Sequence, residues 1–220
     1  MADPLTLDLL AREAAKAGVR LPSAGSHGPL LVHLRLMYAW NRRMNLTAIR
    51  DPAVGLRRHL LEALVALPEL PPPAAEPIRL ADLGSGNGFP ALPLVIVRGD
   101  LRAILIESSG RKADFLRAAA RGARCLARTE VRQERLDRIE QLPDDVEILT
   151  LRAFPEPGRW IEAAVRRPAM RRVFAWLSTE TARDEAANVE RLGLNAKVMP
   201  LPTHGSGSLL SVSRATERES

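Results

Sequence analysis

The feature that most constrains the fold of this chain is a glycine-rich turn at Asp82–Pro90, entered from the apolar run Ile78–Leu83. The turn has the sequence Asp-Leu-Gly-Ser-Gly-Asn-Gly-Phe-Pro. An apolar strand that ends in such a turn and continues into a helix is typical of nucleotide-binding α/β folds. Glycines let the backbone approach a ligand closely and adopt positive φ without a Cβ penalty. The segment therefore predicts a ligand at the end of a sheet strand.

The spacing within the turn distinguishes between classes of cofactor. A dinucleotide fingerprint needs G-x-G-x-x-G, and the sixth position counted from the first glycine is Phe89. An acidic residue two positions before that glycine suits a cationic or amino-acid ligand better than a phosphate. These features favour S-adenosylmethionine (SAM) over NAD. The predicted cofactor-binding residues of the turn are Asp82, Gly84, Ser85, Gly86, Gly88 and Phe89.

A second acidic residue follows the next predicted strand. The run Leu101–Ile106 is apolar and is followed by Glu107. In nucleoside-binding α/β folds, an acidic residue about 20 residues beyond the glycine loop accepts hydrogen bonds from the ribose hydroxyls. The alternative is a solvated residue at a strand end. Behind a glycine-rich turn at this spacing, the ribose-binding interpretation of Glu107 is favoured.

The charge of the chain favours a polyanionic partner. The 220 residues carry 32 Lys and Arg against 26 Asp and Glu, a net charge of +6. Lysine occurs only at Lys16, Lys112 and Lys197. A GC-rich genome would explain arginine in place of lysine, but it does not explain the excess of cations over acids. The excess is typical of nucleic-acid-binding proteins.

Composition also excludes several classes of protein. One cysteine, Cys125, permits no intramolecular disulfide, and we expect it to be a small buried residue in a strand. No apolar run is long enough to span a membrane, and Asp3 and Asp8 interrupt any signal-peptide pattern. We therefore expect a cytoplasmic protein. The histidines show no metal-ligand spacing, so no metal site is predicted.

The pattern along the chain predicts three segments. Residues 1–70 form a helical region, with helices over 5–17, 29–41 and 53–67, the last capped by Asp51 and Pro52. Residues 71–77 are a proline-rich linker. Residues 78–214 form the SAM-binding domain, in which strands and helices alternate.

The alternation predicts the Rossmann-like α/β fold of class I SAM-dependent methyltransferases. This fold has a seven-stranded, mostly parallel sheet, here joined to the helical N-terminal region. Its last two strands would form a hairpin across Pro202–Gly205. We expect strands near 78–83, 101–107, 125–131, 146–151, 171–177, 195–201 and 207–213, and helices near 89–98, 110–121, 135–141, 157–166 and 180–192.

Several segments together resemble a known family, the bacterial small-subunit ribosomal RNA guanine-N7 methyltransferases (RsmG, also called GidB). The resemblance is good over about residues 30–155 and weaker beyond them. The glycine turn is shared with many methyltransferases, whereas the N-terminal segments and Arg152-Ala153-Phe154 are more specific. The matching segments are Trp40-Asn41, Asn45-Leu46-Thr47, Arg58-His59-Leu60, Asp82–Pro90, Glu107-Ser108, Gly110-Arg111-Lys112, Phe115-Leu116 and Arg152-Ala153-Phe154.

The resemblance implies roles for particular residues. Gly84 and Phe89 would contact the cofactor, and Leu136 and Asp137 would flank its adenine. Arg152 would lie at the mouth shared by cofactor and substrate, as a cofactor-binding and catalytic residue. The residues implied to face RNA are Arg58, His59, Arg111, Lys112 and Arg135.

Two of these assignments have plain structural alternatives. A histidine on a helix face, such as His59, is more often structural than substrate-binding. The basic residues of the same set could equally form an exposed charged face.

The chain departs from the family pattern at two places. The family usually has an Asp-Ser pair three residues after the signature histidine, where this chain has Glu62-Ala63. It also usually has a Lys-Gly step after the fifth strand, where this chain has Trp176–Thr179 without a lysine. The second departure leaves open a divergent target.

The expected activity is SAM-dependent transfer of a methyl group to N7 of a guanine in small-subunit (16S) ribosomal RNA, by a monomer acting on the RNA or the ribosomal subunit. Guanine N7 carries a lone pair and no proton, so transfer needs positioning and no general base. A cytosine-C5 enzyme would need a nucleophilic cysteine, and Leu151–Pro155 does not match the motif of amino-group methyltransferases. The alternatives are a methyltransferase of the same fold acting on a small molecule or protein, and a non-catalytic RNA-binding paralogue.

Overall fold

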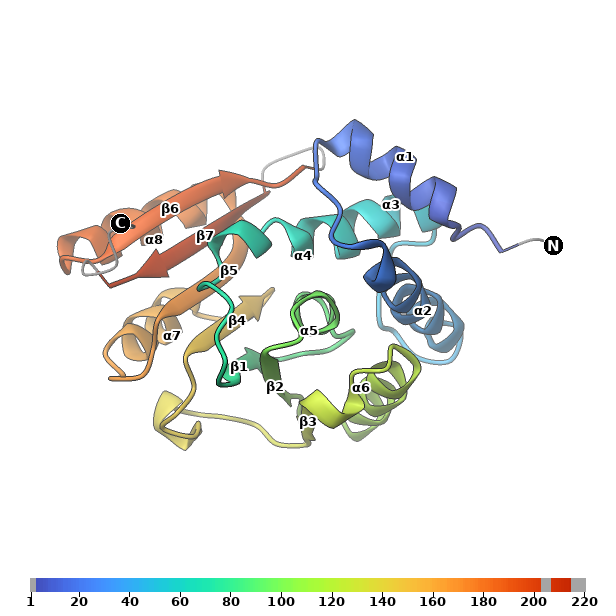
Figure 1. Ribbon diagram of the computed structural model, residues 1–220. Coiled ribbons are helices and arrows are strands. Elements are labelled where there is room, and N and C mark those ends of the chain that lie inside the picture. Colours follow the sequence, from blue (N-terminus) through green and yellow to red (C-terminus); the bar gives the residue numbers. More distant parts are fainter. Residues whose placement is uncertain (1–2, 203–206, 215–220) are drawn as a thin grey trace.

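The computed structural model describes residues 3–202 and 207–214, and its strands form a seven-stranded sheet in the order β3-β2-β1-β4-β5-β7-β6 (Figure 1). The strands β1 to β5 are parallel, whereas β7 is antiparallel to both β5 and β6. The predicted α/β class and mostly parallel sheet are confirmed. The strands are β1 (Ile78–Leu83), β2 (Leu101–Ile106), β3 (Thr129–Arg132), β4 (Ile148–Arg152), β5 (Arg172–Ser178), β6 (Asn195–Pro200) and β7 (Gly207–Ser213).

Helices cover both faces of the sheet, because both faces of its central strands are apolar. One face packs against the N-terminal helices together with α5 and α6, and the other packs against α7 and α8. No described helix is both long and apolar enough to cross a membrane. The helices are α1 (Leu7–Ala17), α2 (Ala24–Asn41), α3 (Pro52–Gly55), α4 (Glu62–Leu64), α5 (Ala91–Val97), α6 (Gly110–Gly122), α7 (Pro157–Val165) and α8 (Thr179–Arg191).

The N-terminal helices share one apolar core with the sheet. Leu30, Leu34 and Met37 of α2 are fully buried in the same cluster as Leu80 of β1 and Phe115 of α6. Helix α2 contacts both α5 and α6, and α4 contacts α5. The helical region and the sheet are therefore held together by a common hydrophobic interior.

The third N-terminal helix differs from a regular α-helix in its middle. Asp51 caps it as predicted, since its carboxylate accepts a hydrogen bond from the Val54 backbone N–H (2.8 Å). Six residues, Leu56–Leu61, then form a π-helix between α3 and α4. Such turns often occur at functional sites, because the extra residue per turn changes the direction in which side chains point. This π-helical turn carries Arg58 and His59.

Between α6 and β4 one predicted helix was wrong and one predicted strand begins later than expected. The helix expected over 135–141 is only a 3₁₀ turn at Ile139–Gln141. The Gln141 side chain accepts hydrogen bonds from the backbone N–H groups of Asp137 and Arg138, which competes with helix formation. The strand expected from residue 125 begins at 129, because a separate 3₁₀ turn at Leu126–Arg128 follows α6 and occupies the first positions of the expected strand.

Some observed elements differ from the expected ones in their boundaries. Helix α2 begins at Ala24, five residues earlier than expected, so Pro29 lies inside its early turns. Cys125 is buried as expected, but it lies just before the 3₁₀ turn and not in a strand, and burial raises the pKa of its thiol. The final antiparallel pair, β6 and β7, is present. Residues 203–206 of the expected connecting turn lie outside the described residues.

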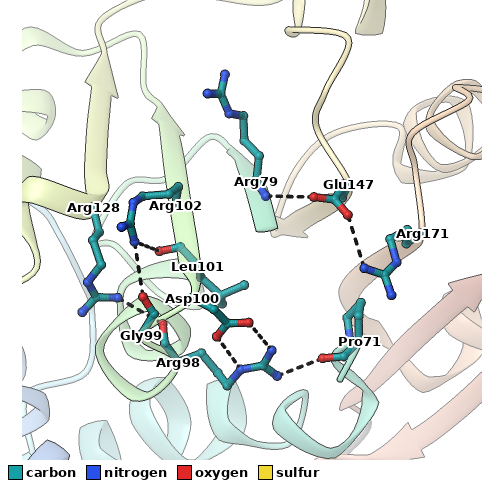
Figure 2. A network of polar contacts seen from close by, with 10 residues as sticks. All are labelled: Pro71, Arg79, Arg98, Gly99, Asp100, Leu101, Arg102, Arg128, Glu147 and Arg171. Atoms are coloured by element: carbon teal, nitrogen blue, oxygen red, sulfur yellow. Dashed lines mark hydrogen bonds and ion pairs between the residues drawn. The ribbon is translucent and has the colours of Figure 1, made fainter. Parts of the chain in front are cut away.

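Several arginines form hydrogen bonds and ion pairs at the edge of the sheet where the parallel strands begin (Figure 2). The Arg98 guanidinium donates to both oxygens of Asp100 (2.8 and 2.6 Å) and to the Pro71 carbonyl (3.0 Å), which ties the proline-rich segment to the sheet. Arg171 forms an ion pair with Glu147 (3.3 Å). Part of the arginine content is thus structural and lies away from the glycine turn.

Candidate functional site

The glycine turn lies directly after β1, at the end of the sheet where ligands bind in open α/β folds. Gly84 and Gly88 have φ values of +66° and +79°. A Cβ on Gly84 would lie 2.8 Å from the Phe154 ring, so a side chain would be excluded even without the backbone strain. Buried Ser85 fixes the turn by donating its backbone N–H to Ile106 (2.9 Å) and its hydroxyl to the Asp82 carbonyl (3.0 Å).

Glu107 is held against this turn by backbone donors. One carboxylate oxygen accepts from the Gly86 N–H (2.9 Å) and the other from the Ser109 N–H (2.8 Å). The side chain is buried, yet it borders a cavity. Each oxygen retains a lone pair for a ligand hydroxyl, and the two backbone bonds fix the direction in which those lone pairs point.

The cavity has a volume of about 440 Å³, within the range of small-molecule sites. Gly84, Glu107, Leu136 and Asp137, four of the residues expected to contact the cofactor, all line it. Leu136, Phe154 and Trp160 supply apolar surface. The rings of Phe154 and Trp160 pack edge to face, with their centroids 5.4 Å apart. The lining residues are Leu83, Gly84, Ile106, Glu107, Ser108, Glu134, Arg135, Leu136, Asp137, Phe154, Pro155, Glu156, Arg159 and Trp160.

Asp82 lies behind the turn with one oxygen unpaired. Its Oδ1 accepts from the Thr150 hydroxyl (2.6 Å), whereas buried Oδ2 has no hydrogen-bond partner among the described residues. Burial raises the pKa of this carboxyl to about 6, although Thr150 and Ser85 oppose the rise. A buried carboxylate oxygen without a partner is costly, so the site favours a ligand that supplies a donor.

Arg152 presents the complementary group at the end of β4. Its Nη2 donates to the Arg58 carbonyl (2.6 Å) and to a Glu62 oxygen (2.5 Å), whereas buried Nη1 has no partner among the described residues. Burial lowers the pKa of the guanidinium, and Glu62 opposes that effect. Asp82 and Arg152 lie near the ends of the neighbouring strands β1 and β4, where Asp82 pairs with Thr150, so an unpaired anionic acceptor and an unpaired cationic donor belong to the same end of the sheet.

Glu62 is a site residue that the sequence interpretation noted only as a departure from the family pattern. It is almost fully buried and forms ion pairs with Arg152 (2.5 Å) and Arg58 (3.4 Å). Its backbone carbonyl accepts from the Trp176 indole N–H (2.9 Å). The sequence signal that could have identified it is its position four residues after Arg58 on a helix.

Two histidines enclose Phe89 of the glycine turn. The ring of His33, from α2, stacks on Phe89 at 4.1 Å, and that of His59 lies 5.4 Å away. Burial lowers the pKa of His33 to about 4 and that of His59 to about 3, so both are neutral at pH 7. His33 was not anticipated from the sequence. The burial of His59 favours the structural alternative for this residue.

Hydrogen bonds explain how these histidines hold the turn. His33 Nε2 bonds the Asn87 carbonyl (2.8 Å), and His59 Nε2 bonds the Thr47 hydroxyl (2.9 Å). The Asn41 side chain accepts from the N–H groups of Leu46 (2.8 Å) and Thr47 (3.0 Å), and the Leu46 carbonyl accepts from the Asn87 amide (3.3 Å). The family-specific N-terminal residues are thus in contact with the cofactor turn.

The residues implied to face RNA lie at three separate places. Arg58 projects from the π-helical turn beside Arg152, and Arg111 and Lys112 lie at the start of α6. Arg135 borders the 440 Å³ cavity and lies 3.7 Å from Asp137. Arg58, Arg111 and Arg135 are exposed, Lys112 is half-buried, and His59 is buried.

Solved structures share the fold. Precorrin-6y C5,15-methyltransferase from Geobacter metallireducens superposes with a TM-score of 0.56 at 13% identity, over 69% of this chain and 87% of that one. Mitomycin 7-O-methyltransferase MmcR gives a TM-score of 0.56 at 16% identity, over 97% of this chain and 69% of that one. At these identities the similarity establishes the fold only.

Sequence relatives are more specific. The ribosomal RNA small subunit methyltransferase G of Xanthomonas oryzae pv. oryzae is 41% identical over 126 residues, 57% of this chain and 56% of the relative. That of Xylella fastidiosa is 47% identical over 111 residues, half of each chain. The chain thus matches about half the length of these curated relatives. A family model described as rRNA small subunit methyltransferase G matches residues 28–207, and the chain therefore belongs to this family, GidB.

Proposed function

We propose that this chain is a SAM-dependent methyltransferase that modifies N7 of a guanine in small-subunit (16S) ribosomal RNA. Membership of the GidB family supports the reaction class. The observation that carries the proposal is the pair of unpaired buried atoms, Asp82 Oδ2 and Arg152 Nη1, at the ends of two strands whose following residues, Leu83 and Phe154, line a nucleoside-sized cavity. The α-ammonium and α-carboxylate of SAM would satisfy this pair, which a dinucleotide would not.

The remaining residues fit the nucleoside part of SAM. Glu107 would accept the ribose hydroxyls, and Leu136 and Asp137 would flank the adenine, with Phe154 and Trp160 as its apolar wall. The backbone of the turn would lie along the cofactor where Gly84 leaves no side chain in the way. The turn residues Gly84, Ser85, Gly86, Gly88 and Phe89 are thus the proposed cofactor loop.

When bound, SAM supplies an electrophilic methyl group on a sulfonium. The chain's own residues would orient the acceptor, because an N7 lone pair needs no proton removed. The neutral histidines at Phe89 already use Nε2 to hold the loop and its supporting segment. Cys125 is buried, and its raised thiol pKa does not suit a nucleophile. The two histidines and Cys125 are thus unsuited to act as base or nucleophile, which supports transfer to a ring nitrogen such as N7.

The proposed RNA contacts are the cations around the site. Arg58, Arg111, Lys112 and Arg135 would contact phosphates, and His59 would act indirectly by supporting Phe89. We further propose that the chain works as a monomer in the cytoplasm, on ribosomal RNA or on the small subunit.

The direct test is methyl transfer from labelled SAM to small-subunit RNA, and to small subunits, from a strain that lacks this gene. Mass spectrometry of digested RNA should reveal labelled 7-methylguanosine. A different labelled nucleoside would contradict the N7 assignment. SAM binding without any labelled RNA would favour a small-molecule or protein acceptor. RNA binding without SAM binding would favour the non-catalytic alternative.

A further inference from the structure

A second cavity lies outside the proposed cofactor site, between the end of α2 and the start of α6. Its volume is about 740 Å³, larger than that of the cofactor cavity. Its wall combines cationic, aromatic and thioether side chains from α2, from the turn that follows α2 and from α6, and the two helices pack together. The lining residues are Ala39, Trp40, Arg42, Arg43, Met44, Arg111 and Asp114.

The positive charge of this cavity is not neutralised by the protein. Arg42, Arg43 and Arg111 are exposed, and none has a carboxylate within ion-pair distance among the described residues. The acidic residue of the lining, Asp114, is paired with Arg117 at 3.0 Å. Three guanidinium groups around one concavity form a binding site for anions, and planar guanidinium groups match phosphate geometry.

Trp40 adds a flat apolar surface to the same cavity. Its ring packs edge to face against Phe115, with the centroids 5.7 Å apart and the planes at 65°. This contact fixes the indole, which is half-buried and borders the cavity with its remaining surface. A fixed aromatic ring beside arginines is the combination on which unpaired nucleobases stack.

Residues that follow and precede the cavity lining in the sequence form hydrogen bonds to the glycine turn and to Glu107. Two residues after Met44, the Leu46 carbonyl accepts from the Asn87 amide of the glycine turn (3.3 Å). Two residues before Arg111, the Ser109 N–H donates to Glu107. The chain segments next to the cavity lining therefore contact both the glycine turn and Glu107.

We propose that this cavity binds an unpaired nucleotide of the RNA next to the target guanine. Arg42, Arg43 and Arg111 would contact its phosphates, and the base would stack on Trp40. The inference rests on the proposed function, because it assigns a second anchoring point to the same RNA substrate.

The charge part of the test is the double variant Arg42→Ala, Arg43→Ala. Its affinity for a transcript of small-subunit RNA should fall at least tenfold at physiological salt. The slope of log affinity against log salt should become shallower by about 1–2, as expected for two lost phosphate contacts. The matched control, Arg183→Ala with Arg191→Ala on exposed positions of α8, should retain the wild-type slope. SAM affinity should be unchanged in both variants.

The aromatic part of the test compares Trp40→Leu with Trp40→Tyr. Leucine keeps apolar packing against Phe115 but offers no ring, so RNA affinity should fall about tenfold with an unchanged salt slope. Tyrosine should recover most of that loss. Thermal melting would identify any variant that fails to fold.

Three outcomes separate the possibilities. Wild-type RNA affinity and salt slope in the arginine double variant would overturn the inference and leave the proposed function intact. Weaker binding to assembled subunits but not to naked RNA would also overturn it, since the occupant would then be a ribosomal protein. If the arginines govern RNA affinity but the wild-type chain methylates no RNA, the inference stands and the proposed function fails.

Discussion

At the scale of single residues, the site depends on the two terminal nitrogens of Arg152, of which one is hydrogen-bonded and the other is not. Arg152 uses Nη2 to bond Arg58 and Glu62 and leaves Nη1 without a partner. A buried carboxylate such as Glu62 needs a cation, since an uncompensated buried charge typically costs about 3–5 kcal/mol. Arg152 therefore has a structural role toward Glu62 and, in our proposal, a binding role toward the cofactor.

Substitution of Arg152 by lysine separates these roles. A lysine can retain the ion pair with Glu62, but it has no second fork to offer a ligand carboxylate. We expect Arg152→Lys to weaken SAM binding about 10- to 100-fold, the effect of one lost charged hydrogen bond. The melting temperature should change little. Calorimetric titration and thermal melting measure both, with Arg166→Lys on α7 as the control. Unchanged SAM affinity would refute the binding role.

The neutral state of His33 predicts a pH dependence of stability. Its pKa is about 4 in the folded chain and 6.5 in its ordinary state. As the pH falls, the unfolded chain therefore takes up a proton on this residue at a higher pH than the folded chain does. Stability is therefore lost between pH 6.5 and 4, by about 2 kcal/mol at pH 5 for this residue. His59 adds a loss of the same sign, whereas the raised pKa of Asp82 acts in the opposite direction.

The variant His33→Gln isolates the contribution of His33. Glutamine can still donate to the Asn87 carbonyl but does not titrate. Denaturant unfolding at pH 7 and pH 5 should show a decrease smaller by about 2 kcal/mol in the variant than in the wild-type chain. Identical decreases would show that His33 is protonated in the folded state.

At the scale of elements, the glycine turn depends on its neighbours as much as on its own sequence. Gly88 has positive φ, and a Cβ there would lie 2.6 Å from Leu92 and 3.0 Å from His33. Gly86 also has positive φ, but its nearest contact would be the Gly84 carbonyl at an ordinary 3.6 Å. The two glycines thus share a backbone conformation and differ in packing.

This difference predicts unequal effects of alanine. Gly86→Ala should cost about 1–2 kcal/mol of stability from backbone strain. Gly88→Ala should cost about 2–4 kcal/mol, because Leu92 and His33 must also move. Chemical denaturation without SAM measures both costs. Equal losses of stability in the two variants would indicate that Leu92 and His33 can move away from a Cβ at position 88 without cost.

At the scale of the whole molecule, the helical N-terminal region is part of the folding unit. Leu30, Leu31, Leu34 and Met37 of α2 and Leu60 of the π-helical turn are buried in the core that also covers one face of the sheet. At about 2 kcal/mol for each buried side chain, their removal costs on the order of 10 kcal/mol. That is comparable to the total stability of a domain, about 5–15 kcal/mol.

We therefore expect residues 71–220 alone not to fold cooperatively. The truncated chain should lack a sharp thermal transition and should bind dyes that report exposed apolar surface. The full chain, measured in parallel, should melt in a single transition. Cooperative unfolding of the truncated chain, with SAM binding retained, would show that 78–214 is an independent domain.

The sequence by itself determined the fold class and the place of the glycine turn at the end of β1. Continuous apolar runs and period-3.6 patterns are local signals, so β1 was predicted to the residue and α6 and α8 to within one residue. The turn Asp82–Pro90 and Glu107 were found because glycines and acids at strand ends have a fixed spacing in this fold. Competition between side-chain and backbone hydrogen bonds is harder to predict. The prediction of a helix over 135–141 was wrong for that reason, since the Gln141 side chain accepts from the Asp137 N–H.

Only the tertiary structure decided which distant residues complete the site. Glu62 and Arg152 are 90 positions apart, and His33 and Asn87 are 54 apart, so no local pattern relates them. Burial then set their chemistry, since desolvation keeps His33 and His59 neutral and raises the pKa of Asp82. A sequence encodes such pairs only through packing of the whole chain, because desolvation and pairing exist only once the N-terminal helices cover the sheet.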